Sequence, residues 1–398
     1  MDRDEETIVI EQNTIKNEQV DVASIVKEKR NEFGLVPLFD ERNIDLKKKL
    51  VRHPTVIRPH FALSGYTKNF VEDSILIFGR TEIEYLNELE PEIRYQRLKQ
   101  IANHRIPCLF FTNYGEYEIE NSFIDIFLEK GIPVFGFRGK TPIFVYRLMD
   151  ILDDVFAPKA SLHGNLVEVF SVGILIIGDS GIGKSELTME LVAKGHLFVA
   201  DDLIFVIRKF GHKLLGYGNQ SVRRWIEIRG AGIFDITQLF GVNRFKSITE
   251  IESIVFLYSQ KNLIEKVHDF MFNYIKSKQN NYSGIPMASL SETELLEEYT
   301  KIPDSELIDA EYKIYKRILK YSVQSRFSSG TFPGSILEVP IVINPIDVHR
   351  VRDVSVIVEA IASRINSVKY HFGDPSEKLN IKTGPEHYLF PPNYYKED

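Results

Sequence analysis

An apolar run that leads into a glycine-rich loop constrains this chain more than any other feature. Residues 173–177 read GILII, and residues 178–185, GDSGIGKS, satisfy the phosphate-loop pattern G-x-x-x-x-G-K-[ST]. The glycines allow a tight turn whose backbone N–H groups point at phosphate oxygens. A helix with Leu187 and Leu191 on one face follows, and Gly195 ends it. A buried strand, this loop and a helix in succession predict a nucleotide site rather than an ordinary glycine-rich turn.

Each residue type in this loop has a chemical reason. Lys184 supplies a positive charge to the β- and γ-phosphates, and the hydroxyl of Ser185 is a ligand for Mg²⁺. The helix predicted over residues 184–194 directs the positive end of its dipole at the same anions. The residues expected to hold the nucleotide are Gly178, Asp179, Ser180, Gly181, Ile182, Gly183, Lys184 and Ser185.

Two adjacent carboxylates follow in residues 198–206, FVADDLIFV. We expect one strand here, which would point Asp201 and Asp202 to opposite faces, so that only one faces the loop. Acids within a strand are costly to bury unless a metal or a catalytic role compensates, and a hydrated sheet edge is the alternative. They lie only 17 and 18 positions after Lys184 (184 to 201 and 202). That short spacing favours a kinase-like site, in which an aspartate accepts the proton of a substrate hydroxyl. The residues alone do not choose between the two.

The first half of the chain alternates short apolar runs with amphipathic stretches. Strands are expected at 74–78, 108–112 and 133–137, and helices at 81–89, 91–103, 118–130 and from 141 onward. Repeated strand–helix units imply a mostly parallel sheet covered by helices. We therefore predict an α/β protein with an N-terminal parallel-sheet domain over 1–157, of which 1–20 are a disordered extension. A C-terminal P-loop kinase α/β domain is predicted over 158–398.

Two charged segments are predicted to lie on the surface. Residues 261–325 have the pattern of a charged helical insertion, in which Ser291 and Glu294 have capping-box spacing and 279–284 form a loop. We expect no chemistry in this insertion. The run Lys47-Lys48-Lys49 is interpreted as a solvated face rather than a binding patch.

Charge and hydropathy exclude several classes of partner. The chain has 398 residues, with 49 basic and 56 acidic side chains and a net charge of −7, which gives no electrostatic attraction to nucleic acid. No stretch of 18 apolar residues occurs and the N-terminus does not resemble a signal peptide, so we expect no membrane partner and a cytoplasmic location. The single cysteine, Cys108, cannot form an internal disulfide, which fits a reducing compartment.

Several blocks resemble the bacterial HPr kinase/phosphorylase family. In the second domain these are GDSGIGKSELTMELVAKGHLFVADD (178–202), IEIRGAGIFDITQLFG (226–241) and the pair His163-Gly164. In the first domain they are RPHFALSGY (58–66), ILIFGRTEIEYL (75–86) and RIPCLFFTN (105–113). The resemblance covers about 20–260 and about 326 to the C-terminus.

The resemblance implies an enzyme that uses ATP and Mg²⁺ to phosphorylate a serine of the phosphocarrier protein HPr, in the regulation of carbon metabolism. It also implies the reverse dephosphorylation with inorganic phosphate, which forms pyrophosphate. It further implies a homo-hexamer, with a C-terminal helix over about 353–370 near the substrate.

The same resemblance assigns roles to single residues. His163 matches an active-site histidine, and Asp202 matches the general base that deprotonates the serine hydroxyl. Glu227 matches a second ligand of Mg²⁺ beside Ser185. Arg326 is the best match to a catalytic arginine, although an ordinary surface arginine is the alternative, because the flanking QSRFSS fits poorly.

One departure from the family concerns the reverse reaction. Where the family has Pro-Val-Arg-Pro-Gly-Arg, residues 345–350 read PIDVHR, so Asp347 replaces an arginine. A carboxylate would repel phosphate there, and we expect dephosphorylation to be weak. Two other functions stay open from sequence: a small-molecule kinase with the same site, and a nucleotide sensor that has lost catalysis.

Overall fold

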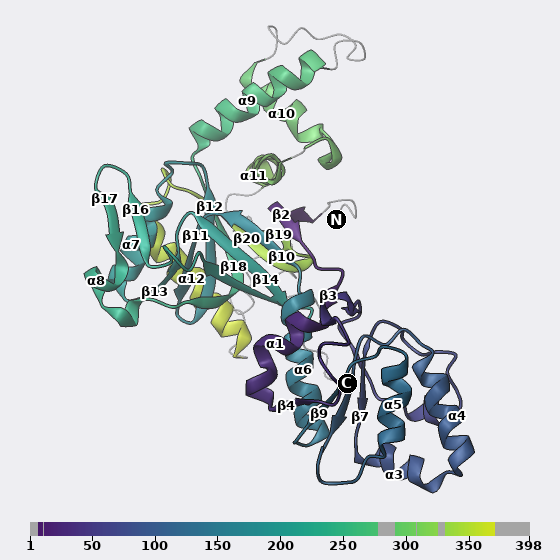
Figure 1. The fold of residues 1–398 in the computed structure, drawn as a ribbon. Helices are drawn as coiled ribbons and strands as arrows, with labels where there is room; N and C mark the ends of the chain where they lie inside the picture. Colours follow the sequence, from purple (N-terminus) through teal and green to yellow (C-terminus); the bar gives the residue numbers. More distant parts are fainter. Residues whose placement is uncertain (1–6, 11, 278–290, 308, 325–330, 371–398) are drawn as a thin grey trace. The chain divides into compact units, whose positions relative to one another are not determined.

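The computed structural model describes residues 7–10, 12–277, 291–307, 309–324 and 331–370 (Figure 1). The chain forms two compact units, one of residues 16–157 and one of residues 158–398 together with residues 1–15. Each unit is a sheet covered by helices, which confirms the α/β class. No helix in the described ranges is both long and apolar enough to cross a membrane.

The unit of residues 16–157 contains a mostly parallel five-stranded sheet. Its strand order is β4 (Leu35–Pro37), β9 (Val134–Phe137), β8 (Leu109–Thr112), β7 (Ile75–Phe78) and β6 (Val56–Ile57). Strands β6 to β9 run parallel, and β4 joins β9 in the antiparallel direction. A second, two-stranded sheet pairs β3 (Val20–Asp21) with β5 (Leu50–Val51), which follows the 3₁₀ turn Leu46–Lys48.

Alternate residues of these strands face opposite layers of helices. Leu76 and Phe78 of β7 pack in a cluster with helices α2 (His60–Leu63), α3 (Arg80–Glu88), α4 (Pro91–Ala102) and α5 (Asn121–Glu129). Ile75 and Ile77 pack in a second cluster with α1 (Val22–Phe33) and α6 (Thr141–Phe156). Because both faces are covered, the strands are continuous apolar runs, which is why the sequence revealed them.

The second unit contains an eleven-stranded mixed sheet whose centre is parallel. The central strands are β12 (Val172–Gly178), β18 (Ile248–Tyr258) and β20 (Val339–Asp347). Beyond β12 lie β11 (Asn165–Val169) and β13 (Leu197–Ala200), and beyond β20 lie β19 (Phe332–Ile336) and β1 (Ile8–Val9). An antiparallel arm continues from β18 through β15 (Lys213–Gly218), β14 (Leu203–Lys209), β10 (Lys159–His163) and β2 (Gln12–Ile15).

Helices cover both faces of the parallel centre. Ile174 and Ile176 of β12 pack with α7 (Lys184–Lys194) and α12 (Val354–Lys369), as do Val255 and Leu257 of β18. Leu175 belongs to the opposite cluster, which contains α9 (Gln260–Ser277), α10 (Glu292–Lys301) and α11 (Ala310–Gln324). A separate hairpin of β16 (Trp225–Ile228) and β17 (Gly232–Asp235) precedes α8 (Ile236–Phe240) and the 3₁₀ turn Val242–Arg244 (Figure 1).

The charged segment after residue 260 is helical, but it is more than a surface insertion. Ser291 caps α10 and forms the expected capping box with Glu294, whereas the expected loop at 279–284 lies outside the described residues. Val267, Tyr299 and Tyr315 are buried in one cluster with the sheet. The many charged residues on the other faces of these helices conceal this apolar stripe in the sequence.

Residues 8–10 and 12–15 were expected to belong to a disordered extension, and this expectation is wrong for them. Strand β1 pairs in parallel with β19, Ile8 opposite Gly334, and β2 pairs with β10 of the second unit. Strands this short carry almost no periodic signal, and their pairing partners lie far away in the sequence. Ile8 is completely buried, whereas the neighbouring Val9 is half exposed.

We predict that Ile8→Ala destabilises the second unit by about 2–4 kcal/mol, because it removes a buried side chain and leaves a cavity. The corresponding drop in the midpoint of thermal unfolding is about 4–16 °C. Val9→Ala is the matched control and should change the midpoint less, since Val9 is already half exposed. Equal midpoints for both variants in differential scanning calorimetry would contradict the place of β1 in this sheet.

Candidate active site

The predicted phosphate loop lies at the carboxyl end of the central strand β12. Parallel strands bind ligands at this edge of a sheet, outside their carboxyl ends. Gly178 has a φ of 147°, and a Cβ there would collide with the carbonyl oxygen of Leu257 on β18. Gly183, with a φ of 104°, is the N-cap residue that precedes α7. The loop therefore needs glycine at both ends, and α7 points its N-terminus at the space that the loop encloses.

Lys184 is half-buried in this loop. Its Nζ donates hydrogen bonds to the carbonyl oxygens of Gly178, at 2.9 Å, and Asp179, at 2.8 Å. Burial lowers the pKa of Lys184, although the nearby carboxylates of Asp179, Asp202 and Asp201 oppose that shift. In this structure the backbone carbonyl oxygens accept the hydrogen bonds of the Lys184 ammonium group. Phosphate oxygens of a bound nucleotide would accept them instead.

The two adjacent aspartates do not lie inside one strand, so that expectation is wrong. They form a bend between β13 and β14, which pair with different neighbours in the sheet. Asp202 has a φ of 65°, a left-handed conformation that breaks the strand. Asp and Asn adopt this conformation more readily than other non-glycine residues, but the sequence pattern of FVADDLIFV does not show which residue will do so.

Asp201 is turned toward the phosphate loop and is well hydrogen-bonded. Its carboxylate accepts from Asn165 Nδ2 at 2.6 Å, from Ser185 Oγ at 3.2 Å and from the backbone N–H of Glu227 at 3.1 Å. Burial raises the pKa of Asp201, against the effect of these hydrogen bonds. This carboxylate therefore lies beside the hydroxyl that the sequence predicted as a metal ligand.

Asp202 has the opposite environment, because its side chain is exposed. Its backbone carbonyl accepts a hydrogen bond from the N–H of Gly164 at 3.0 Å. Because β10 and β14 are antiparallel, His163 lies opposite Leu203, the residue after Asp202. The structure thus brings the exposed residues His163 and Asp202 to the same edge of the sheet.

The β16–β17 hairpin also reaches the phosphate loop. The backbone N–H of Glu227 contacts Asp201, and Arg229 Nη2 donates to Ser180 Oγ at 2.7 Å. The side chain of Glu227 is exposed. In the part of the chain that the structure describes, no three His, Cys, Asp or Glu side chains are already gathered as a metal cage. The carboxylate that contacts the hydroxyl of Ser185 is that of Asp201, and the backbone of Glu227 is bonded to the same carboxylate.

The second residue of the loop, Asp179, is bound by the inserted helices. Lys266 of α9 forms an ion pair with Asp179 and another, at 2.8 Å, with Glu311 of α11. Asn262 Nδ2 lies 3.5 Å from the same aspartate. Although burial acts to raise the pKa of Asp179, hydrogen bonds with Glu311 and Lys266 outweigh it and lower the pKa. Burial and the neighbouring Asp179 raise the pKa of Glu311.

Asp347 ends β20, two strands away from the phosphate loop. It is buried, opposite Tyr258 of β18, and its carboxylate accepts from the backbone N–H of His349 at 3.1 Å. Arg350 Nε lies 3.4 Å from the same carboxylate. Arg326 lies outside the described residues. Helix α12 begins at Val354, close to the start predicted for the C-terminal helix.

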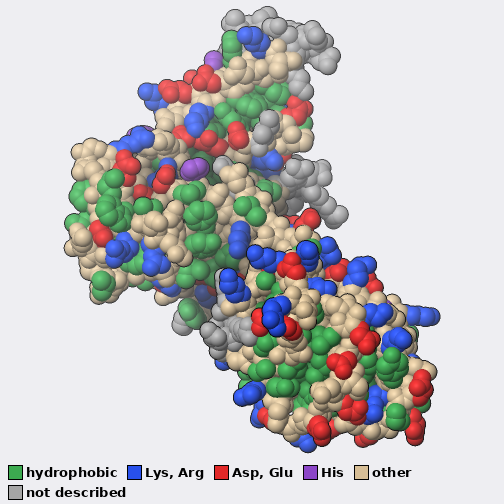
Figure 2. All heavy atoms as spheres, in the orientation of Figure 1, with side chains coloured by type: hydrophobic (Ala, Val, Ile, Leu, Met, Phe, Trp, Pro, Cys, Tyr) green, Lys and Arg blue, Asp and Glu red, His purple; other side chains and the backbone are tan. Residues whose placement is uncertain are grey.

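Large apolar side chains are exposed on the β16–β17 hairpin, in the turn before it, on α8 and in the turn that follows α8 (Figure 2). They are Val222, Trp225, Ile233, Leu239 and Val242. An exposed apolar surface of this kind is typical of a contact with another protein.

Sequence reasoning missed four residues that contact the loop or its neighbours: Asn165, Asp201 as a partner of Ser185, Arg229 and Lys266. Asn165 and Arg229 lie inside or next to the blocks that carried the family resemblance, so their position was a usable signal. Lys266 gave no signal, because it is one lysine among many in a charged helix.

Comparisons with known proteins find the same family for both parts of the chain. The HPr Serine kinase N terminus family matches residues 20–152, and the HPr Serine kinase C-terminal domain family matches residues 154–290. The chain is 34% identical over 241 residues to the HPr kinase/phosphorylase of Chloroherpeton thalassium, covering 61% of this chain and 70% of that protein. It is 34% identical over 212 residues to the HPr kinase/phosphorylase of Prosthecochloris aestuarii, covering 53% and 62%. The solved Hpr(Ser) kinase/phosphatase of Coxiella burnetii is 20% identical with a TM-score of 0.35, covering 55% of this chain and 97% of that one.

Proposed function

Because the chain belongs to the HPr kinase/phosphorylase family, we propose that it transfers the γ-phosphoryl group of ATP to a serine hydroxyl of the phosphocarrier protein HPr. One observation carries the proposal: an exposed carboxylate, Asp202, lies next to a phosphate loop whose lysine is in place. The wider proposal, from the family resemblance, is a homo-hexamer in the cytoplasm that regulates carbon metabolism.

The chain's own residues supply binding and proton transfer. The backbone N–H groups of 178–185, Lys184 and the N-terminus of α7 would bind the β- and γ-phosphates. Asp202 would take the proton of the serine hydroxyl as that oxygen attacks the γ-phosphorus in line with the departing ADP. In the reverse direction Asp202 would return this proton. His163 lies at the same edge, where it would contact the substrate or the transferring group.

The oxygen donors beside Lys184 suit Mg²⁺, which prefers hydroxyl, carboxylate and phosphate oxygens. Ser185 is the first candidate ligand, and Glu227 is the second. Asp201, which accepts a hydrogen bond from the Ser185 hydroxyl, would orient that hydroxyl or bind the ion in its place. Bound Mg²⁺ would neutralise charge on the β- and γ-phosphates. Exposure lets Glu227 turn toward such an ion, whereas Asp201 is already held by three hydrogen bonds.

A protein substrate suits this site better than a metabolite. Trp225 and Ile233 are exposed apolar side chains of the hairpin, which contacts the loop through Arg229, and a small substrate would not cover them. A small-molecule kinase would need an enclosed pocket for its substrate next to Asp202. A nucleotide sensor without catalysis would need no exposed base.

The test is transfer of label from γ-³²P-ATP to purified HPr in the presence of Mg²⁺, followed by identification of the labelled residue. We expect label on one serine of HPr, at a rate that depends on Mg²⁺. ATP binding without transfer would favour the sensor, and label on a metabolite from a cell extract would favour the small-molecule kinase. Trp225→Ala should raise the KM for HPr several-fold and leave the KM for ATP unchanged.

We predict a slow reverse reaction, because Asp347 takes the place of a family arginine. Inorganic phosphate added to serine-phosphorylated HPr should yield pyrophosphate at no more than about a hundredth of the forward rate, which corresponds to about 2.7 kcal/mol of lost stabilisation. Pyrophosphate released per minute measures this directly. Rates of similar size in the two directions would show that residues 345–350 serve dephosphorylation despite the acidic residue.

A further inference from the structure

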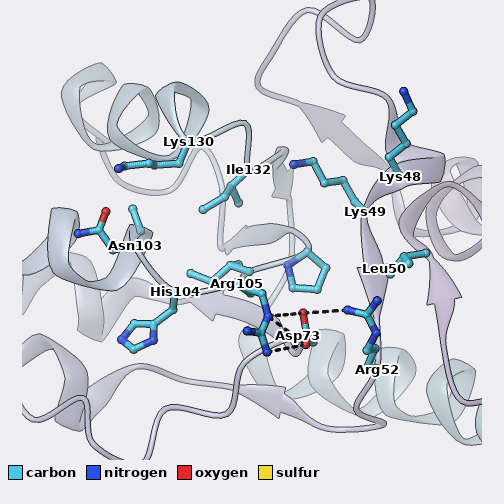
Figure 3. Close-up of a pocket in the computed structure, with 13 residues that line it drawn as sticks. Lys48, Lys49, Leu50, Arg52, Asp73, Asn103, His104, Arg105, Lys130 and Ile132 are labelled. Carbon is cyan, nitrogen blue, oxygen red and sulfur yellow. Dashed lines mark hydrogen bonds and ion pairs between the residues drawn. The ribbon is translucent and has the colours of Figure 1, made fainter.

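A basic pocket lies in the unit of residues 16–157, far along the chain from the phosphate loop (Figure 3). Its volume is about 420 Å³, within the range of small-molecule sites. The charged side chains that line it are Lys48, Lys49, Arg52, Arg105, Lys130 and Asp73. Five cationic residues and one carboxylate therefore line the pocket, in a chain whose net charge is −7.

The floor of the pocket is fixed by backbone hydrogen bonds between three loops. The N–H of Arg52 donates to the carbonyl of Asp73 at 2.9 Å, and the N–H of Asp73 donates to the carbonyl of Arg105 at 2.7 Å. The N–H of Val22 donates to the carbonyl of Lys49 at 2.8 Å. Asp73 itself has a left-handed φ of 59°. The cationic side chains thus project from a backbone that does not need to rearrange when a ligand binds.

Asp73 also holds two guanidinium groups at the pocket. Its carboxylate lies 3.4 Å from Arg52 Nη1 and 3.2 Å from Arg105 Nη2 (Figure 3). Arg105 makes a further pair with Glu72, at 2.7 Å. Each guanidinium has five N–H donors, so these pairs fix both groups and leave donors for a ligand. Planar guanidinium groups bind phosphate oxygens two at a time.

Lys49 and Lys130, the two lysines expected to contribute most to binding an anion, have no ion pair among the described residues. Lys49 points toward Ile132 in Figure 3, and Lys130 extends past Asn103. Lys48 points away from the middle and lies 3.9 Å from Asp45, so it contributes less. Helices α4 and α5 end at this pocket, and their carbonyl ends favour nearby cations. Two helix ends, each equivalent to about half a charge, do not balance Lys49, Lys130 and the two arginines.

We propose that this pocket binds a small ligand that carries two or more phosphate groups. Clustered cations repel one another, and a polyanion relieves that repulsion while it occupies the fixed guanidinium donors. The side chains of Lys49, Arg52, Arg105 and Lys130 would bind the phosphate groups of the ligand rather than a base or a sugar. The pocket is thus a second phosphate site, separate from the one at Lys184.

Isothermal titration calorimetry of the full chain with inorganic diphosphate tests the proposal. The measurement uses the Lys184→Ala background, so that the phosphate loop contributes little. We expect one diphosphate bound per chain, with binding that weakens as salt rises from 0.05 to 0.3 M. The double variant Lys49→Gln/Lys130→Gln should lose at least tenfold in affinity.

The matched control is Lys27→Gln/Lys68→Gln, which removes the same charge from exposed positions of the same unit. It should bind as the parent does, and both double variants should keep the parent's circular dichroism and thermal midpoint. Titration with ADP shows whether the pocket also contacts a nucleoside. ADP that binds as tightly as diphosphate, or more tightly, agrees with recognition through the phosphate groups. Absence of diphosphate binding in the Lys184→Ala chain, or equal affinities for the two double variants, would overturn the proposal.

Discussion

Asp202→Asn is expected to slow phosphoryl transfer by about 10²–10⁴-fold, the range that a positioned general base contributes. The amide cannot accept the proton of the serine hydroxyl at neutral pH. Asn tolerates the left-handed φ of 65° at this position, so the bend between β13 and β14 should persist. Because Asp202 is exposed and does not touch Lys184 in the structure, ATP affinity should stay within about twofold of the parent.

The rate is measured as label transferred from ATP to HPr under single-turnover conditions, and ATP affinity by calorimetry. Asp269→Asn is the matched control, because Asp269 is an exposed aspartate on α9. If the transfer rate of Asp269→Asn falls as far as that of Asp202→Asn, the loss would indicate general damage to the unit. Full activity of Asp202→Asn would exclude Asp202 as the base and direct attention to Asp201 or His163.

Lys184→Ala is expected to weaken ATP binding by about 10²–10³-fold. A charged hydrogen bond contributes about 1.5–3 kcal/mol, and Lys184 would make such bonds to both the β- and γ-phosphates. In the structure its Nζ is bound to the carbonyls of Gly178 and Asp179, so truncation also leaves those carbonyls without a partner. Transfer to HPr should fall at least as far as affinity.

Fluorescence titration with a labelled ATP analogue measures the affinity. Lys261→Ala provides the comparison, since Lys261 is exposed on the first turn of α9 and pairs only loosely with Glu265, at 3.9 Å. ATP affinity of Lys184→Ala within about threefold of the Lys261→Ala chain would show that nucleotide binds elsewhere, and the proposed function would then fail at its first step.

The strands that could be predicted are those buried on both faces. The runs at 74–78, 108–112, 133–137 and 173–177 are apolar throughout because helices cover each side, and such runs need no knowledge of the partner strand. Strands β1 and β2 pair with segments more than a hundred residues away, so nothing local reveals them. Helices α9, α10 and α11 were mistaken for a surface insertion for another reason: charged residues on their outer faces conceal the apolar stripe that packs on the sheet.

The site divides along similar lines. The phosphate loop is contiguous, and its residue types follow from its chemistry, so its position could be read from residues 178–185. The roles of Asp201 and Asp202 depend on one left-handed residue and on hydrogen bonds from Asn165, Ser185 and Glu227. Those contacts join four separate segments, and no pattern along the chain encodes them.

The ion pair between Lys266 and Asp179 links the folding of the inserted helices to the nucleotide site. Any ligand that binds only when the loop is correctly formed lowers the population of states in which α9 is detached from it. Amide hydrogen exchange in α9 and α11 should therefore slow when ATP binds, although neither helix belongs to the loop. In Lys266→Met this slowing should be lost from α9 and α11 and retained in α7. Nucleotide binding would then no longer stabilise the helices that cover this face of the sheet.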